Sequence, residues 1–114
     1  EIVAHNQRHP DGVALYTAMS AAVIDASHQA YPWFRQHLMA TIEYLVDTLE
    51  RGKAAGEVHP DAPSEQIARK LVALSDGLQV QWLCSRADGG RDVDMHAVTA
   101  GVVSDIKDRW LVRS

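Results

Sequence analysis

The residues most often used in catalysis and metal binding do not form a complete reactive motif in this chain. His5 and His9 lie four residues apart, a spacing that can place two metal ligands on one helix face, but no nearby cysteine or carboxylate completes a site. No Ser-His-Asp or Cys-His pattern is readable, and the Asp-Gly-Gly of residues 88–90 follows no strand, unlike a phosphate-binding loop. We therefore expect a protein that is not an enzyme and that holds no metal or cofactor.

A second group of side chains combines aromatic surface with polar tips, as pockets for small molecules do. Three of them recur on one side of a helical pattern in residues 32–55, and three others are spaced to face them. The candidate effector-binding residues are Tyr16, Met19, Trp33, His37, Tyr44 and Trp82. Ordinary packing of a helical bundle accounts for the same residues, and Met19 in particular fits a core position.

Helices must position these side chains, because apolar residues recur at steps of three and four and no segment alternates with a period of two. The chain has 114 residues and is 46% hydrophobic, which suits one domain with its own core. The expected helices cover residues 1–8, 11–27, 32–55, 63–85 and a last segment that Asp92 caps. Pro32 suits a first helical turn, and Gly56 suits the end of a helix. The predicted fold is an all-α, antiparallel bundle of about five helices.

The segment of residues 63–85 is apolar on two opposite sides, and such a helix must be covered on both. Its core face carries Ile67, Leu71, Leu74, Leu78 and Trp82. We expect a two-fold dimer in which the last two long helices of each chain form a four-helix interface. The candidate interface residues are Val72, Asp76, Val80, Leu83, Val98, Val102, Ile106 and Trp110. The alternative is that the last helix alone covers the second side.

Asp76-Gly77 interrupts the middle of this same helix, where glycine costs about 1 kcal/mol relative to alanine. Without a Cβ, Gly77 allows another backbone to come close or the helix to bend. Asp76 can accept hydrogen bonds across an interface or near a helix end. These possibilities stay open at the level of sequence.

The stretch from Asp25 to Arg86 resembles the C-terminal domain of the tetracycline-repressor (TetR) family of transcriptional regulators. "DASHQAYPWFRQHL" is similar to that family's break between two helices, and "LERGKAAGEVHPDAPSEQIARKLVALSDGLQVQWL" is similar to the following junction. The matching positions of the junction are Gly56, Glu57, Asp61, Pro63, Glu65, Ala68, Ala73, Leu74, Asp76, Gly77 and Leu78. The resemblance implies a small-molecule effector in the bundle, homodimerisation and DNA binding through an N-terminal helix-turn-helix.

No segment of this chain fits that helix-turn-helix, so residues 1–114 read as a single ligand-binding and dimerisation domain cut from a longer regulator. The net charge of -4 and the absence of a basic patch argue against DNA binding by this segment itself. The single cysteine, Cys84, suits a reducing cytoplasm, and no apolar run is long enough for a membrane span. The alternative function is an effector-free, all-α domain that binds another protein.

Overall fold

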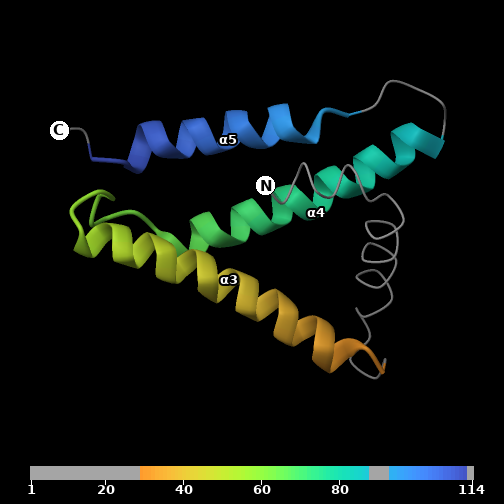
Figure 1. The fold of residues 1–114 in the computed structure, drawn as a ribbon, viewed down its shortest axis with the longest axis horizontal. Coiled ribbons are helices and arrows are strands. Elements are labelled where there is room, and N and C mark those ends of the chain that lie inside the picture. The colour runs from red at the N-terminus through yellow and green to blue at the C-terminus, as the bar shows by residue number, and fades with distance from the viewer. Residues whose placement is uncertain (1–28, 88–92, 113–114) are drawn as a thin grey trace.

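The computed structural model describes residues 29–87 and 93–112, and this part of the chain is all-α. Its helices are α3 (Tyr31–Ala54), α4 (Ser64–Ala87) and α5 (Met95–Trp110), labelled as in Figure 1. The described part therefore contains three helices rather than five. The two further helices expected over residues 1–8 and 11–27 lie outside it. None of the described helices combines the length and the hydropathy that a bilayer span requires.

Helix α3 begins and ends close to the positions that proline and glycine mark. Pro32 lies in its first turn, where the missing backbone N–H removes no helical hydrogen bond. At the other end, Ala55 caps the helix, and Gly56 follows with a φ of 76°, a left-handed conformation that glycine adopts without steric cost. The last turn of α3 carries Arg51 and Lys53, whose positive charges complement the helix dipole.

Helix α5 begins later than the sequence suggested. The expected cap was Asp92, but the N-cap is Asp94, whose Oδ1 accepts a hydrogen bond of 2.9 Å from the backbone N–H of Ala97. Both aspartates precede the same apolar pattern in the sequence. They differ in which backbone N–H lies three residues further on, the position from which an N-cap side chain accepts a hydrogen bond. The boundaries of α4, by contrast, fall within two residues of those expected.

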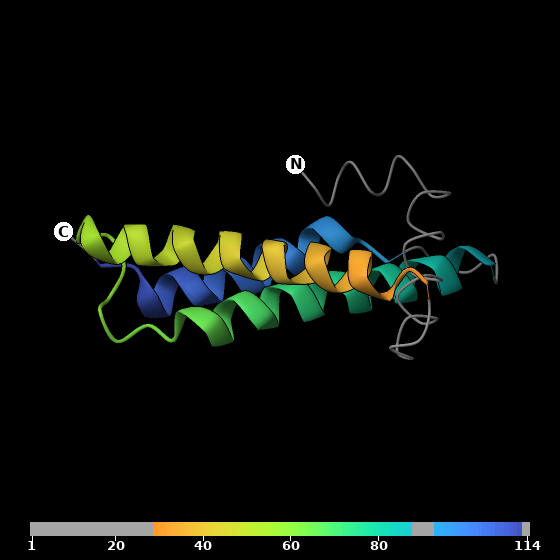
Figure 2. The same ribbon diagram turned by 90° about the horizontal axis from the view of Figure 1, so that it is seen from below.

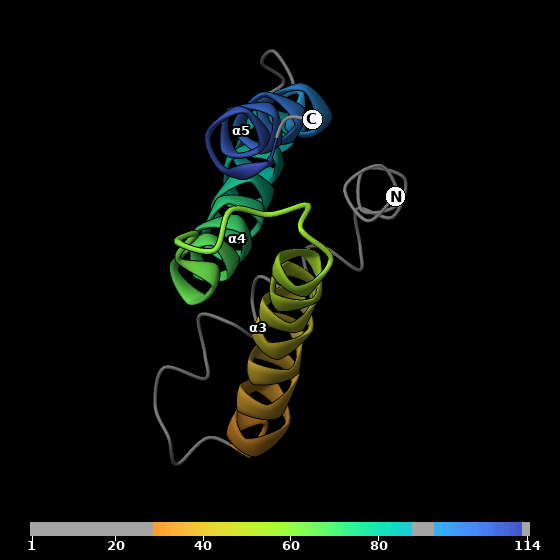
Figure 3. The same ribbon diagram turned by 90° about the vertical axis from the view of Figure 1, so that its left-hand side faces the viewer.

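The three helices lie side by side, and α4 occupies the middle position (Figure 3). Helix α4 packs against both α3 and α5. The axes of α3 and α4 meet near the loop that joins them and diverge from there, whereas α5 runs back along α4 (Figure 1). Seen from the perpendicular direction, the three helices overlap along much of their length, and α4 extends past the other two at the end away from the α3–α4 loop (Figure 2).

Two hydrophobic clusters hold α4 against its neighbours. The α4–α5 cluster consists of Leu78, Trp82 and Met95, with Leu74, Leu83 and Val93 packed against it. The loop cluster consists of Val58, Ala62 and Ile67, with Leu49, Leu71, Ile106 and Trp110 packed against it. All five residues expected on the core face of α4 belong to one of these clusters, so that prediction is confirmed.

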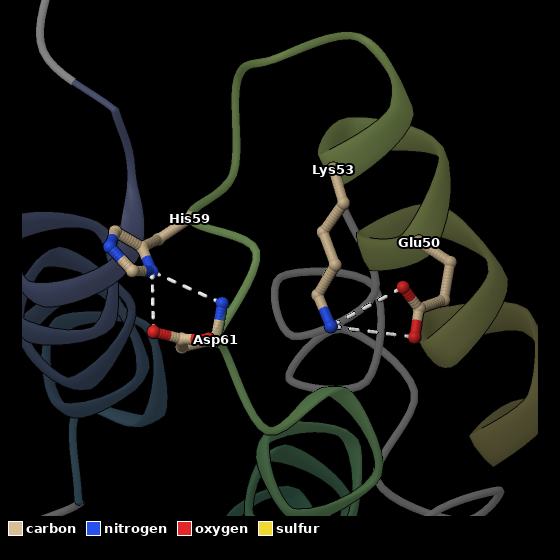
Figure 4. Close-up of polar contacts among 4 residues, drawn as sticks. All are labelled: Glu50, Lys53, His59 and Asp61. Atoms are coloured by element: carbon tan, nitrogen blue, oxygen red, sulfur yellow. Dashed lines mark hydrogen bonds and ion pairs between the residues drawn. The ribbon is translucent and has the colours of Figure 1, made fainter.

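The loop between α3 and α4 also binds the end of α5 through its backbone. His59 N–H donates to the carbonyl of Trp110 at 2.7 Å, and Val112 N–H donates to the carbonyl of Glu57 at 2.9 Å. The loop is further ordered by His59, whose Nδ1 accepts a hydrogen bond from the backbone N–H of Asp61 at 3.1 Å (Figure 4). The point where α3 and α4 meet is therefore tied to the C-terminal end of α5.

Candidate functional site

Two polar groups, Asp76 on α4 and His37 on α3, interact electrostatically. Asp76 lies in the middle of α4, partly buried, and His37 of α3 is its electrostatic neighbour. Burial raises the pKa of the Asp76 carboxyl above its ordinary value, and the charge of His37 acts in the opposite direction with a smaller effect. A carboxyl whose ionised form is poorly solvated is poised to interact with a hydrogen-bond donor or a cation.

Two aromatic rings extend this pair along α3. The Trp33 and His37 rings are stacked, with centroids 5.2 Å apart and planes at 5° to each other. They lie four residues apart, so they are neighbours on one side of the helix. The side chain of Trp33 remains 53% exposed. A partly exposed aromatic surface therefore lies on α3 next to His37.

Gln79 adds a polar group that the sequence analysis did not single out. It is 7% exposed, and its Oε1 has no hydrogen-bond partner within the described ranges. Gln79 lies three residues after Asp76, so the two side chains are neighbours on α4. The signal was available in the sequence as a polar residue at helical spacing from Asp76. Gln79 was not expected in the site because glutamine is more often exposed than buried.

The other expected effector residues do not join this group in the described part of the chain. Trp82 is 3% exposed and belongs to the α4–α5 cluster, where its ring packs with Leu78 and Met95. Tyr44 lies on α3 but is 66% exposed. Tyr16 and Met19 lie outside the described residues. Of the expected effector residues, Trp33 and His37 are thus neighbours on α3, and Asp76 and Gln79 are polar neighbours on α4 that were not expected in the site.

The residues expected at a dimer interface divide into two groups. Leu83, Ile106 and Trp110 pack against clusters of their own chain. Val80 is 46% exposed and Val98 is 42% exposed, while Val72 and Val102 are partly buried. The exposed members thus lie on α4 and α5. Asp76 interacts electrostatically with His37 of α3.

The described ranges contain no group of three or more histidine, cysteine or acidic side chains arranged to hold a metal ion. His5 and His9 lie outside these ranges. Comparison with protein-family models found no match, and searches of characterised proteins and of solved structures found no significant similarity. The physical arrangement of the helices and side chains therefore carries the functional argument.

Proposed function

We propose that this chain is the regulatory domain of a TetR-like transcriptional regulator, which binds a small-molecule effector between its helices and forms a homodimer. In this proposal the effector contacts Trp33, His37 and Asp76, and the cytoplasmic parent protein binds DNA through a separate N-terminal domain. The proposal rests chiefly on α4, which carries a polar group toward α3 and exposes small, uncharged side chains elsewhere along its length. A helix with these two features can serve a ligand and a partner chain at the same time.

The surface proposed for dimerisation is here called the small-residue surface. It consists of Ala73, Gly77, Val80 and Cys84 on α4 and Ala97, Val98 and Gly101 on α5, all of them exposed. On each helix the members recur at steps of three or four, or lie adjacent at the edge of one face, so they share that face. A Cβ built on Gly77 or on Gly101 meets no atom of the described residues beyond its own helical backbone within 4 Å. Packing within the described residues therefore does not explain either glycine, whereas close approach of a second helix would.

Helices α4 and α5 run in opposite directions (Figure 1). With this orientation and the helical rotation between residues, the small residues of α4 and those of α5 fall on the same side of the α4–α5 pair. A second copy that presents the same surface would complete a four-helix interface about a two-fold axis. Its helices could approach closely, as the alanine and glycine positions allow. Effector binding between α3 and α4 would then change the position of α3, which is not held by this interface. Such a ligand shifts the conformation only by its difference in affinity for the two states.

The test is the solution mass of three versions of the chain. Wild type should sediment at twice the chain mass of 12.6 kDa at micromolar concentration. Val80→Arg, which places a charge in the centre of the small-residue surface, should give the monomer mass. Ala100→Arg is the matched control, because Ala100 is exposed on α5 outside this surface, and it should remain a dimer. A wild-type monomer, or equal effects of the two substitutions, would contradict the proposed assembly.

The second candidate is an effector-free domain that binds another protein. Trp33 and Tyr44 favour it, since both are large aromatic residues more than half exposed on α3. Exposed aromatic residues are enriched at protein interfaces. A stable wild-type monomer that no small molecule stabilises against heat would favour this candidate over the regulator.

A further inference from the structure

The residues that follow α5 lie against the loop between α3 and α4 and are here called the strap, residues 110–112 (Figure 1). Leu111 has an extended backbone, and two hydrogen bonds join the strap to the loop, one on either side of the bridge between Val58 and Leu111. The side chains of Leu111 and Val112 are 43% and 49% exposed. A pair of extended segments this short is at most marginally stable in water. We therefore expect the strap to open at a small cost in free energy.

Val58 connects the strap to the last turns of α3. Its side chain is 7% exposed, and a Cβ built on Gly52 would come within 2.5 Å of Val58 Cγ2, so this methyl group packs tightly against α3. The N–H of Val58 also donates to the carbonyl of Gly52 at 3.1 Å. Closely packed groups transmit a displacement instead of absorbing it. Movement of Leu111 on the strap therefore reaches α3 through Val58.

Trp110 adds a second connection between the strap and α3. Its ring packs against the loop cluster, to which Leu49 of α3 also contributes. The ring of His59 meets Trp110 edge-on, with centroids 6.2 Å apart and planes at 60° to each other. Release of the strap would remove these contacts together with the two hydrogen bonds, so the cluster beside the end of α3 would lose part of its packing.

The geometry of α3 amplifies any change at this end. The helix diverges from α4 beyond the loop (Figure 1) and has 24 residues, which at 1.5 Å each give a length of about 36 Å. A rotation of about 10° near the loop would therefore move the first turn of α3 by about 6 Å.

We propose that the strap is a conformational device that sets the angle between α3 and α4. Docked on the loop, it holds α3 in the observed position; released, it allows α3 to rotate away from that position. The proposal deepens the proposed function and rests on it for its regulatory meaning. An effector that favours one position of α3 would favour docking or release of the strap by the same factor, because coupling between two equilibria is reciprocal.

Val112→Pro releases the strap with little other change. Proline removes the N–H that donates to the carbonyl of Glu57, and the extended backbone of Leu111 is the conformation that a residue before proline prefers. Glu57 and Val112 are exposed, so water can replace the lost donor. Val112→Ala is the matched control, because it shortens the same side chain and keeps the N–H.

Amide hydrogen exchange, followed by NMR on the full chain, reports the release. Val112→Pro should speed exchange at His59, whose N–H donates to the carbonyl of Trp110, by about twofold to tenfold, the range expected for one net hydrogen bond. Exchange at Val58, whose N–H donates to Gly52, should rise with it, and Val112→Ala should change neither. Unchanged exchange at His59 in Val112→Pro would overturn the strap. A rise at His59 without one at Val58 would overturn its connection to α3.

Distances between spin labels measure the position of α3. The labels are attached through Gln36→Cys on α3 and Gln81→Cys on α4, both at exposed positions, in a chain that also carries Cys84→Ser. Excess unlabelled chain suppresses distances between copies. Electron-electron double resonance should give the same narrow distribution with and without Val112→Ala. Val112→Pro should broaden this distribution or displace it by several ångströms, and an unchanged distribution would overturn the proposal.

The outcomes separate this proposal from the proposed function, because the test uses no effector and reads distances within one chain. A monomer in which Val112→Pro moves α3 keeps the strap and rejects the regulator. A dimer in which Val112→Pro leaves α3 in place keeps the regulator and rejects the strap.

Discussion

At the scale of single residues, Asp76 is the group on which most of the account depends. Its pKa is raised by burial, so the folded chain binds the proton more tightly than the unfolded chain does. The stabilising contribution of protonated Asp76 is therefore complete below the unfolded pKa of about 3.9 and is lost as the pH rises through the higher pKa of the folded state. Asp76→Asn, which is neutral at every pH, removes this dependence.

We expect Asp76→Asn to match wild type in unfolding free energy near pH 3 and to become more stable than wild type as the pH rises above about 4. The gain arises because asparagine avoids the desolvation of a buried carboxylate, which outweighs the lost attraction to His37. Urea denaturation at a series of pH values measures it. A difference between the two proteins that stays constant with pH, or that favours wild type at neutral pH, would contradict this explanation.

Residue roles were the least predictable part of the sequence. Trp33 and His37 were expected on one side of a single helix, and their rings stack there. Asp76 was expected at a dimer interface, and within this chain its electrostatic neighbour is His37 on another helix. Trp82 has the ring and polar tip of a ligand contact, yet it is in the core. Which helix a side chain meets depends on the angle between helices, and periodicity within one helix does not contain that angle.

At the scale of elements, Gly52 has a structural role that Gly77 lacks. A Cβ built on Gly52, in the last turns of α3, comes within 2.5 Å of Val58 Cγ2 in the loop cluster. Gly52→Ala should therefore destabilise the chain by up to about 2 kcal/mol, since overpacking costs about 1–3 kcal/mol and the gain in helix propensity offsets about 1 kcal/mol of it. Urea denaturation in dilute solution, where chains are unpaired, measures this effect.

Gly77→Ala is the matched control in a helix of the same length. The added Cβ meets nothing within 4 Å among the described residues outside its own helical backbone, so alanine should stabilise the unpaired chain by up to about 1 kcal/mol. A gain in stability for Gly52→Ala, or a loss for Gly77→Ala in dilute solution, would contradict these packing assignments.

Element boundaries were predicted well because single residues mark them. Helix α3 was expected over 32–55 and spans Tyr31–Ala54, with Pro32 and Gly56 setting its ends. The start of α5 was placed at Asp92 because both aspartates precede the same apolar pattern in the sequence; the cap is Asp94, which accepts a hydrogen bond from the N–H of Ala97. The antiparallel bridge between Val58 and Leu111 was not expected, because a contact between distant loop and terminal residues leaves no periodic trace.

At the scale of the whole molecule, the three described helices pack together on one side and leave the small-residue surface exposed on another. The loop cluster and the α4–α5 cluster close the side where α4 meets its neighbours. The small-residue surface remains exposed on α4 and α5, and Val80 and Val98 are its largest members. The all-α class followed from periodicity alone, whereas periodicity within one chain does not identify a partner for this surface.

Interchain contacts at Val80 and Val98 would show directly whether two chains pair through the small-residue surface. A mixture of equal parts of carbon-13-labelled and unlabelled chain is examined by isotope-filtered nuclear Overhauser spectroscopy at a few hundred micromolar. Pairing through the small-residue surface predicts interchain signals from the methyl groups of Val80 and Val98 to protons of the partner's α4 and α5, and their loss in Val80→Arg. Valine methyl signals that connect only to protons of the same chain would contradict it.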